Sequence, residues 1–117
     1  MKRVDIVTVS LQGDDGKPRP AVVIESDRLP PTDSVLVCLV TSALREETPF
    51  RRHPVEASPS TGLGMASHVM VDKIFAVRRT KCGAPIGALD PAIMLAVTRK
   101  LALVIGLADA SAGTERT

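Results

Sequence analysis

Short runs of apolar and β-branched residues recur along the chain up to Val77, and this spacing predicts a domain built mainly of β-strands. The first run, Val4 to Leu11, is rich in β-branched residues, and the Gly- and Asp-rich segment Gln12 to Gly16 ends it with a turn signal. Two further runs, Ala21 to Ile24 and Ser34 to Ser42, are almost continuously apolar, as in strands buried on both faces. The pattern therefore predicts a hairpin with a long loop, followed by a third buried strand.

The middle of the chain predicts shorter strands separated by polar segments. Pro54 to Glu56 is a short strand candidate, and the Gly-, Ser- and Pro-rich stretch Ala57 to Ser67 predicts a flexible loop. Apolar residues resume at His68 to Val71 and again at Ile74 to Val77, which predicts a further pair of strands. A basic turn, Arg78 to Lys81, follows them.

The final element differs in kind, because Asp90 followed by Pro91 sets a preferred N-cap residue before a preferred first residue of a helix. Gly106 stands where the helix is expected to end. Six apolar residues between these signals fall near one helical face: Ile93, Met94, Val97, Leu101, Val104 and Ile105. We therefore expect an α+β domain over residues 1–108, with a strongly bent antiparallel sheet or open barrel covered by a C-terminal α-helix, and a frayed polar tail over residues 109–117.

Composition narrows the range of functions. The 117 residues, 44% of them hydrophobic, suit one compact domain. Phe50 and Phe75 are the only aromatic residues, which excludes an aromatic base-stacking platform, and the net charge of +2 is too small to identify a partner. Cys38 and Cys82 lack metal-binding spacing. Because no signal peptide or membrane-spanning run is visible, we expect a soluble cytoplasmic protein with reduced thiols.

The segment KPRPAVVI, Lys17 to Ile24, carries the first candidate for chemistry. Pro18 and Pro20 stiffen the chain on either side of Arg19, immediately before a buried strand. A planar, permanently charged guanidinium held at a strand end is suited to gripping a phosphate with two hydrogen bonds. From this segment alone the alternative is an ordinary solvated arginine before a core strand.

Several segments in order resemble the PemK/MazF family of toxins from toxin–antitoxin pairs. They are KPRPAVVI, the strand ending in Thr41 and Ser42, VMVDKI at residues 69–74, and IGALD before the final helix, and the resemblance runs from Arg3 to Ala108. It implies an SH3-like open barrel with a C-terminal helix, which acts as a homodimer and cleaves single-stranded RNA without a metal ion or cofactor. It also implies a cognate antitoxin that lays an extended or helical, often acidic segment across the RNA groove.

Carried over by position, Arg19 looks like the catalytic arginine of this family, Thr41 like its catalytic threonine, and Asp72 like an acidic residue near the site. Ser42 and His68 complete the candidate catalytic set. The chain departs from some relatives in having no histidine in its first loop and Met70 where they have an arginine, so the resemblance leaves the general base unassigned. Ordinary structural roles are the alternatives: a strand-end hydroxyl for Thr41, a turn-capping carboxylate for Asp72, and a surface loop histidine for His68.

Metal-free RNA cleavage uses the ribose 2′-hydroxyl as an internal nucleophile and needs a base, a cation at the phosphate and an acid for the leaving oxygen. Arg19 fits the cation, and Thr41 can position the phosphate or the 2′-hydroxyl. Asp72 can act as base, as a partner of Arg19 or as a reader of a base edge. The candidate RNA-binding residues are Lys17, Arg51, Arg52, His53, Arg78 and Arg79, with a solvated charged connector as the alternative for those next to His53.

We therefore expect a metal-independent endoribonuclease toxin that leaves 2′,3′-cyclic phosphate and 5′-hydroxyl ends. Two alternatives keep the fold without this activity. One is a toxin like CcdB that binds DNA gyrase, although that branch depends on a tryptophan and this chain has none. The other is a degenerate member that only binds its antitoxin.

Overall fold

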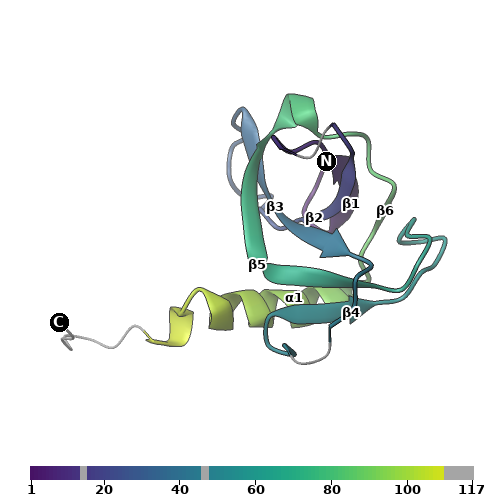
Figure 1. The fold of residues 1–117 in the computed structure, drawn as a ribbon. Coiled ribbons are helices and arrows are strands. Elements are labelled where there is room, and N and C mark those ends of the chain that lie inside the picture. The colour runs from purple at the N-terminus through teal and green to yellow at the C-terminus, as the bar shows by residue number, and fades with distance from the viewer. Residues whose placement is uncertain (14–15, 46–47, 110–117) are drawn as a thin grey trace.

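A computed structural model describes residues 1–13, 16–45 and 48–109, and its centre is one six-stranded antiparallel sheet that curls into a half-barrel (Figure 1). The strand order is β4-β5-β3-β2-β1-β6. The strands are β1 (Asp5–Val9), β2 (Arg19–Val23), β3 (Ser34–Thr41), β4 (Arg52–Val55), β5 (Ser67–Arg78) and β6 (Gly87–Ala88). The predicted bent sheet with a C-terminal helix is confirmed, as is the hairpin of the first two strands.

The two faces of the sheet are both buried, which explains the continuous apolar runs of β2 and β3. On one face, side chains such as Val22 and Val40 pack in a cluster that includes the helix residue Val97. On the other face, Ala21, Val37 and their neighbours form a second cluster inside the curl. Because successive side chains of a strand point to opposite faces, an aliphatic run can fill both clusters at once.

β5 is one long strand, and the prediction of two strands between His68 and Val77 is wrong. Its first half pairs with both β4 and the end of β3, whereas its second half pairs with the beginning of β3. The register changes between the two halves, since Cys38 lies opposite Ile74 but Val40 lies opposite Val69. This irregularity lets the strand bend through the curl without ending. The polar pair that interrupts the apolar pattern, Asp72 and Lys73, falls at the bend.

The helix α1 (Pro91–Val104) begins and ends where the sequence predicts. The Asp90 carboxylate accepts a hydrogen bond from the Ala92 N–H at 3.3 Å, and Gly106, at φ +77°, follows the helix in a left-handed conformation. The buried helix residues are Met94, Val97 and Leu101, and they hold α1 against β5 and β4. Ile105, expected on the same face, is 65% exposed because it lies beyond the last helical turn.

Two short 3₁₀ helices complete the described elements. η1 (Arg79–Lys81) forms the basic turn after β5, and η2 (Leu107–Asp109) follows α1. Asp109, assigned to the tail by its polarity, thus belongs to a short helix, and residues 110–117 of the expected tail lie outside the described residues. Among the helices that the structure describes, none is both long and apolar enough to span a membrane.

The segment Ala57 to Ser67 is ordered by its own contacts, so the predicted flexibility is not what its packing shows. The Gly62 N–H donates to the Ser58 carbonyl at 3.0 Å, and Thr61 is buried. Strand β6 packs closely against it, because a Cβ atom added to Gly87 would lie 2.3 Å from the Thr61 backbone. Glycine at this position therefore permits the close approach of two backbones.

Candidate active site

Three candidate catalytic residues lie in one row across neighbouring strands. Thr41 at the end of β3 is paired with His68 of β5. Ala21 of β2 is paired with Leu39 of β3, so the same register extended by two residues sets Arg19 across from Thr41. Cross-strand partners point to the same face, and adjacent strands lie about 4.8 Å apart. The structure thus brings Arg19, Thr41 and His68 side by side along one end of the sheet.

A cleft opens at this end of the sheet. Its volume is about 410 Å³. It is lined by Lys17, Pro18, Arg19, Pro20, Val40, Thr41, Ser42, Leu63, Gly64, Met65 and Ser67. Among the residues that the structure describes, those lining the cleft include two cations and no carboxylate. Such a site attracts an anion, and both the predicted arginine and the predicted threonine lie on its wall.

The Thr41 hydroxyl accepts a hydrogen bond from the backbone and can still donate one. Its Oγ1 accepts a hydrogen bond from the Ala43 N–H at 3.1 Å, which is the strand-end role that the sequence offers as an alternative. A hydroxyl that accepts in this way keeps its own O–H for a second partner. Thr41 can therefore donate to a phosphate oxygen in the cleft while its side chain is held by the following loop. Ser42, next along the chain, is exposed and lines the same cleft.

His68 is 9% exposed and belongs to β5, so the alternative of a surface loop histidine is wrong. Its Nδ1 lies 3.5 Å from Nη1 of Arg52. Because a guanidinium can only donate, this contact favours the tautomer in which Nδ1 accepts and Nε2 carries the ring proton. Arg52 is itself held by the loop after β3, since its Nη1 donates to the Ala43 carbonyl at 2.6 Å.

Asp72 stands apart from this row. It lies within β5, so it does not cap a turn, and its carboxylate faces Nη1 of Arg51 at 3.8 Å. It is not among the residues lining the cleft. The Asp72 charge also acts on Cys38. The pKa of the Cys38 thiol is raised to about 12, mainly by burial and secondly by the Asp72 charge. The structure therefore places Asp72 next to Arg51.

The predicted RNA-binding residues divide between different environments. Lys17 lines the cleft beside Arg19. Arg52 is half-buried and faces His68, whereas the next residue, His53, points to the helix side of the sheet. The pKa of His53 is lowered by burial, then by the Lys100 charge and by His68. The three consecutive residues from Arg51 to His53 thus do not form one continuous patch.

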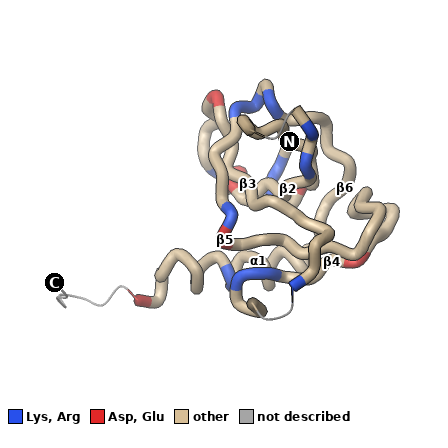
Figure 2. Tube along the Cα trace, in the orientation of Figure 1, with Lys and Arg blue, Asp and Glu red and all other residues tan. Residues whose placement is uncertain are grey.

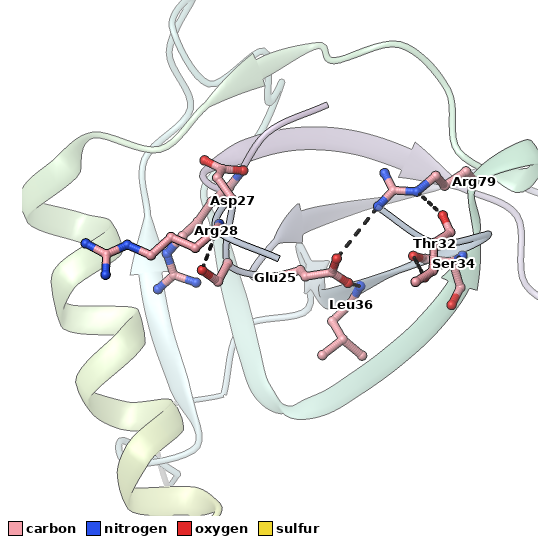
Figure 3. Close-up of polar contacts among 9 residues, drawn as sticks. Glu25, Asp27, Arg28, Thr32, Ser34, Leu36 and Arg79 are labelled. Atoms are coloured by element: carbon pink, nitrogen blue, oxygen red, sulfur yellow. Dashed lines mark hydrogen bonds and ion pairs between the residues drawn. The ribbon is translucent and has the colours of Figure 1, made fainter. Parts of the chain in front are cut away.

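Arg78 and Arg79 lie at the other end of β3, because Arg78 is the partner of Ser34. Thr41 is seven steps along the strand from Ser34, a distance of about 23 Å. Arg79 makes two contacts there. Its Nε donates to the Thr32 carbonyl at 2.6 Å, and its Nη2 lies 3.7 Å from Oε2 of Glu25 (Figure 3). This arginine links the turn after β5 to the loop before β3.

Lys100 of α1 also lies in this region, although the sequence does not identify it as a candidate site residue. Its Nζ donates to the Arg52 carbonyl at 2.8 Å, and Figure 2 shows basic positions of α1 beside β4. The one available signal is its place on the polar face of the helix, which many solvated lysines share. No group of three or more potential metal ligands occurs within residues 1–13, 16–45 and 48–109.

Comparison with known proteins agrees with this geometry. Residues 2–105 match the family described as PemK-like, MazF-like toxin of type II toxin–antitoxin system. The chain is 36% identical over 109 residues to the probable endoribonuclease MazF of Mycolicibacterium smegmatis, covering 92% of this chain and 99% of that protein.

Solved structures share the fold. An endoribonuclease from a mycobacterial species, solved in complex with its cognate antitoxin, superposes with a TM-score of 0.74 at 23% identity, covering 92% of this chain and 96% of its own. Mycobacterium tuberculosis toxin MazF-mt6 gives a TM-score of 0.73 at 22% identity, with coverages of 86% and 95%. MazF in the MazE–MazF crystal structure from Deinococcus radiodurans gives 0.70 at 21% identity, with coverages of 91% and 95%.

Proposed function

Because this chain belongs to the PemK-like, MazF-like toxin family of type II toxin–antitoxin systems, we propose that it is an endoribonuclease toxin that cleaves single-stranded RNA at specific sequences without a metal ion. The observation that carries this proposal is the row of Arg19, Thr41 and His68 at one end of the sheet. Two members of the row line a cleft whose described walls contain cations and no carboxylate. A phosphodiester is the natural anion for such a site.

In the proposed reaction, the 2′-oxygen attacks the neighbouring phosphorus and the bond from phosphorus to the 5′-oxygen breaks. The guanidinium of Arg19 holds two phosphate oxygens as negative charge develops on them, and the Thr41 hydroxyl donates to the same group. The 2′-hydroxyl proton leaves to solvent, and the departing 5′-oxygen takes up a proton from solvent. His68, whose Nδ1 faces Arg52, keeps its Nε2 proton and donates a hydrogen bond from it to the departing 5′-oxygen. The products carry a 2′,3′-cyclic phosphate and a 5′-hydroxyl.

Asp72 has a supporting place in this proposal. Its carboxylate lies 3.8 Å from Arg51, a residue whose side chain is 63% exposed, and this contact orients a cation beside β4. Lys17 and Arg51 would meet the RNA backbone outside the reacting phosphate, and Arg78 and Arg79 would take no part in the reaction.

The cellular setting follows from the family. We infer that the toxin acts on mRNA in the cytoplasm, that a cognate antitoxin neutralises it, and that the active form is a homodimer. Exposed aliphatic side chains at the end of α1 support an association between subunits: Leu103, Ile105 and Leu107 are 53%, 65% and 69% exposed. Analytical ultracentrifugation at micromolar concentration tests whether the protein is a dimer. A monomer that still cleaves RNA would contradict the homodimer.

The first experiment incubates the purified protein with a long mixed-sequence RNA in EDTA, next to the variants Arg19→Ala and Thr41→Val, and maps new 5′ ends by primer extension. We expect discrete cuts by the wild type and a loss on the order of 100-fold or more with Arg19→Ala, since that variant removes the charge that stabilises the transition state. Thr41→Val keeps the shape of the side chain and should also reduce cleavage.

The outcomes separate the hypotheses. Cuts of equal strength in wild type and Arg19→Ala would mean that the reaction occurs elsewhere or belongs to a contaminant. Intact RNA from folded, antitoxin-free wild-type protein would contradict the nuclease, and DNA gyrase would then be the binding partner to test.

A further inference from the structure

A second, smaller hollow lies beside His68, the cross-strand partner of Thr41. Its volume is about 240 Å³, and we call it the outer pocket. It is lined by Arg45, Thr48, Pro49, Arg52, Pro54, His68 and Lys100. The lining brings three permanent cations and a histidine together from the segment after β3, from β4 and β5, and from α1. Within the part of the chain that the structure describes, no carboxylate lines it.

Two of these cations are held in place by the fold. Arg52 donates from Nη1 to the Ala43 carbonyl at 2.6 Å, and Lys100 donates from Nζ to the Arg52 carbonyl at 2.8 Å. Each contact uses only part of the donor capacity of the group, since a guanidinium has five N–H donors and an ammonium has three. Burial lowers the pKa of Lys100, as expected for a cation partly withdrawn from water. The fixed positions reduce the conformational entropy that a bound anion would remove.

Thr48 adds an independent observation. Its Oγ1 is buried and has no hydrogen-bond partner among the described residues. A buried hydroxyl without a partner costs free energy, which an acceptor entering the pocket would recover. The outer pocket therefore offers both positive charge and the Thr48 hydroxyl, which can donate a hydrogen bond to an oxygen atom of a ligand.

The outer pocket and the cleft are related through one cross-strand pair of residues. Thr41 lines the cleft, and its cross-strand partner His68 lines the outer pocket. Because neighbouring strands are about 4.8 Å apart, a chain whose reacting phosphate lies at Thr41 passes His68 within a short distance. The lining contains no aromatic ring on which a base could stack, and its only apolar members are two prolines.

We propose that the outer pocket binds a second phosphate of the RNA, next to the one that is cleaved, through Arg45, Lys100 and the hydroxyl of Thr48. The inference rests on the proposed nuclease function and deepens it, because binding at this phosphate would position the strand so that the scissile phosphate meets Arg19 and Thr41. Lys100 and Thr48 act as positioning residues and do not touch the reacting atoms.

The test measures binding separately from cleavage. A fluorescein-labelled pool of short 2′-O-methyl RNA with randomised sequence cannot be cleaved through its 2′-oxygen, and its affinity is followed by fluorescence anisotropy at several salt concentrations. Lys100→Gln is compared with Arg99→Gln, which removes the same charge from the neighbouring exposed position of α1. We expect about tenfold weaker binding with Lys100→Gln and a salt-dependence slope smaller by about 0.7, as for one lost phosphate contact on a single strand. Arg99→Gln should leave both values near those of the wild type.

Two further variants guard against a loss that is merely structural, because Lys100 also bonds to β4. Thermal unfolding reports whether Lys100→Gln folds, and Arg45→Gln removes a pocket charge without touching that bond. Thr48→Val should weaken binding without changing the salt slope, since it removes a hydroxyl and no charge.

Equal behaviour of Lys100→Gln and Arg99→Gln, or failure of the wild type to bind the pool, would overturn the second phosphate site. An effect confined to binding of an acidic antitoxin peptide would overturn it in favour of a carboxylate. The nuclease proposal is judged apart, by the cleavage of long RNA and its loss with Arg19→Ala.

Discussion

The two ends of β3 present arginines in opposite settings. At the end with Ser34, which we call the paired end, Arg79 meets the Glu25 carboxylate and the Thr32 carbonyl, and Glu25 accepts a further bond from the Leu36 N–H at 3.1 Å (Figure 3). At the end with Thr41, which we call the cleft end, the described walls of the cleft and of the outer pocket include cations without a carboxylate. The same residue type therefore stabilises the fold at one end and prepares a site for an anion at the other.

This difference shows what separates a functional arginine from a structural one. The positive charge of a guanidinium next to a carboxylate is largely neutralised within the protein. Cations that line an open cleft raise the local positive potential there, which attracts a polyanion. Stability and activity should therefore respond in opposite ways to substitutions at the two ends.

The largest difference between the two ends should come from His68→Leu at the cleft end. Replacing the ring removes the proposed hydrogen bond from Nε2–H to the departing 5′-oxygen, so the rate of cleavage should fall by about 100-fold, as for the loss of one donor to a developing oxyanion. Single-turnover cleavage of a mapped RNA site measures the rate, and thermal unfolding shows whether the buried substitution is tolerated. A phosphorothiolate substrate, whose 5′-sulfur leaves without protonation, should restore much of the lost rate. No rescue by that substrate would contradict the proposed hydrogen bond from His68 to the leaving oxygen.

Arg79→Ala at the paired end should have the converse effect. It removes the bond to Thr32 and the ion pair with Glu25, so the free energy of unfolding should fall by about 1 to 2 kcal/mol. Urea denaturation measures this change, and RNA cleavage at a temperature where the variant is folded should stay near the wild-type rate. Arg78→Ala is the matched control, because Arg78 is an exposed neighbour with the same charge. Loss of cleavage by folded Arg79→Ala would break the division between the two ends.

The smallest effect concerns pH and His53, which lies on the helix side of β4. Its pKa in the folded state lies below the ordinary value of 6.5, because burial and the charge of Lys100 disfavour the imidazolium. The unfolded chain therefore binds more protons as the pH falls through about 6.5, and the free energy of unfolding should decrease until the folded-state pKa is reached. Urea titrations at about pH 7.5 and pH 5.5 should show a smaller difference for His53→Asn than for the wild type. An unchanged difference would assign the effect to other groups.

Much of the fold could be predicted from the sequence, because its strands and helix carry strong local signals. The apolar runs of β2 and β3 and the Asp90–Pro91 helix start are examples, and the observed elements begin and end within a few residues of their predicted limits. β5 could not be predicted as one strand, since Asp72 and Lys73 interrupt its apolar pattern at a bend that only the curled sheet explains. The order within Ala57 to Ser67 depends on contacts with a segment more than twenty residues further along the chain.

The site was predictable to a different degree. Arg19 and Thr41 followed from the family resemblance, and register brings them together. His68 was a candidate with a surface loop histidine as the alternative, because the Gly- and Ser-rich segment before it suggests a loop, although the residue is buried in a strand. Arg79 was grouped with the RNA-binding residues because its acidic partner, Glu25, lies far away in the sequence. Charge matching of this kind is a tertiary property, and a local pattern does not contain it.

The register change in β5 separates the two ends of β3 in one further sense. On the paired side of the irregularity Cys38 meets Ile74, and on the cleft side Val40 meets Val69, so the ladders are aligned independently. A single-residue insertion elsewhere in a two-sided strand would turn every following side chain to the wrong face. At the irregularity the pairing between β3 and β5 is already interrupted, so an added residue there need not shift the pairing on either side. At this position, one half of the barrel can change in length while the other half keeps its strand alignment. Substitutions or insertions that alter substrate preference could therefore be made at the cleft end without changing the rest of the sheet.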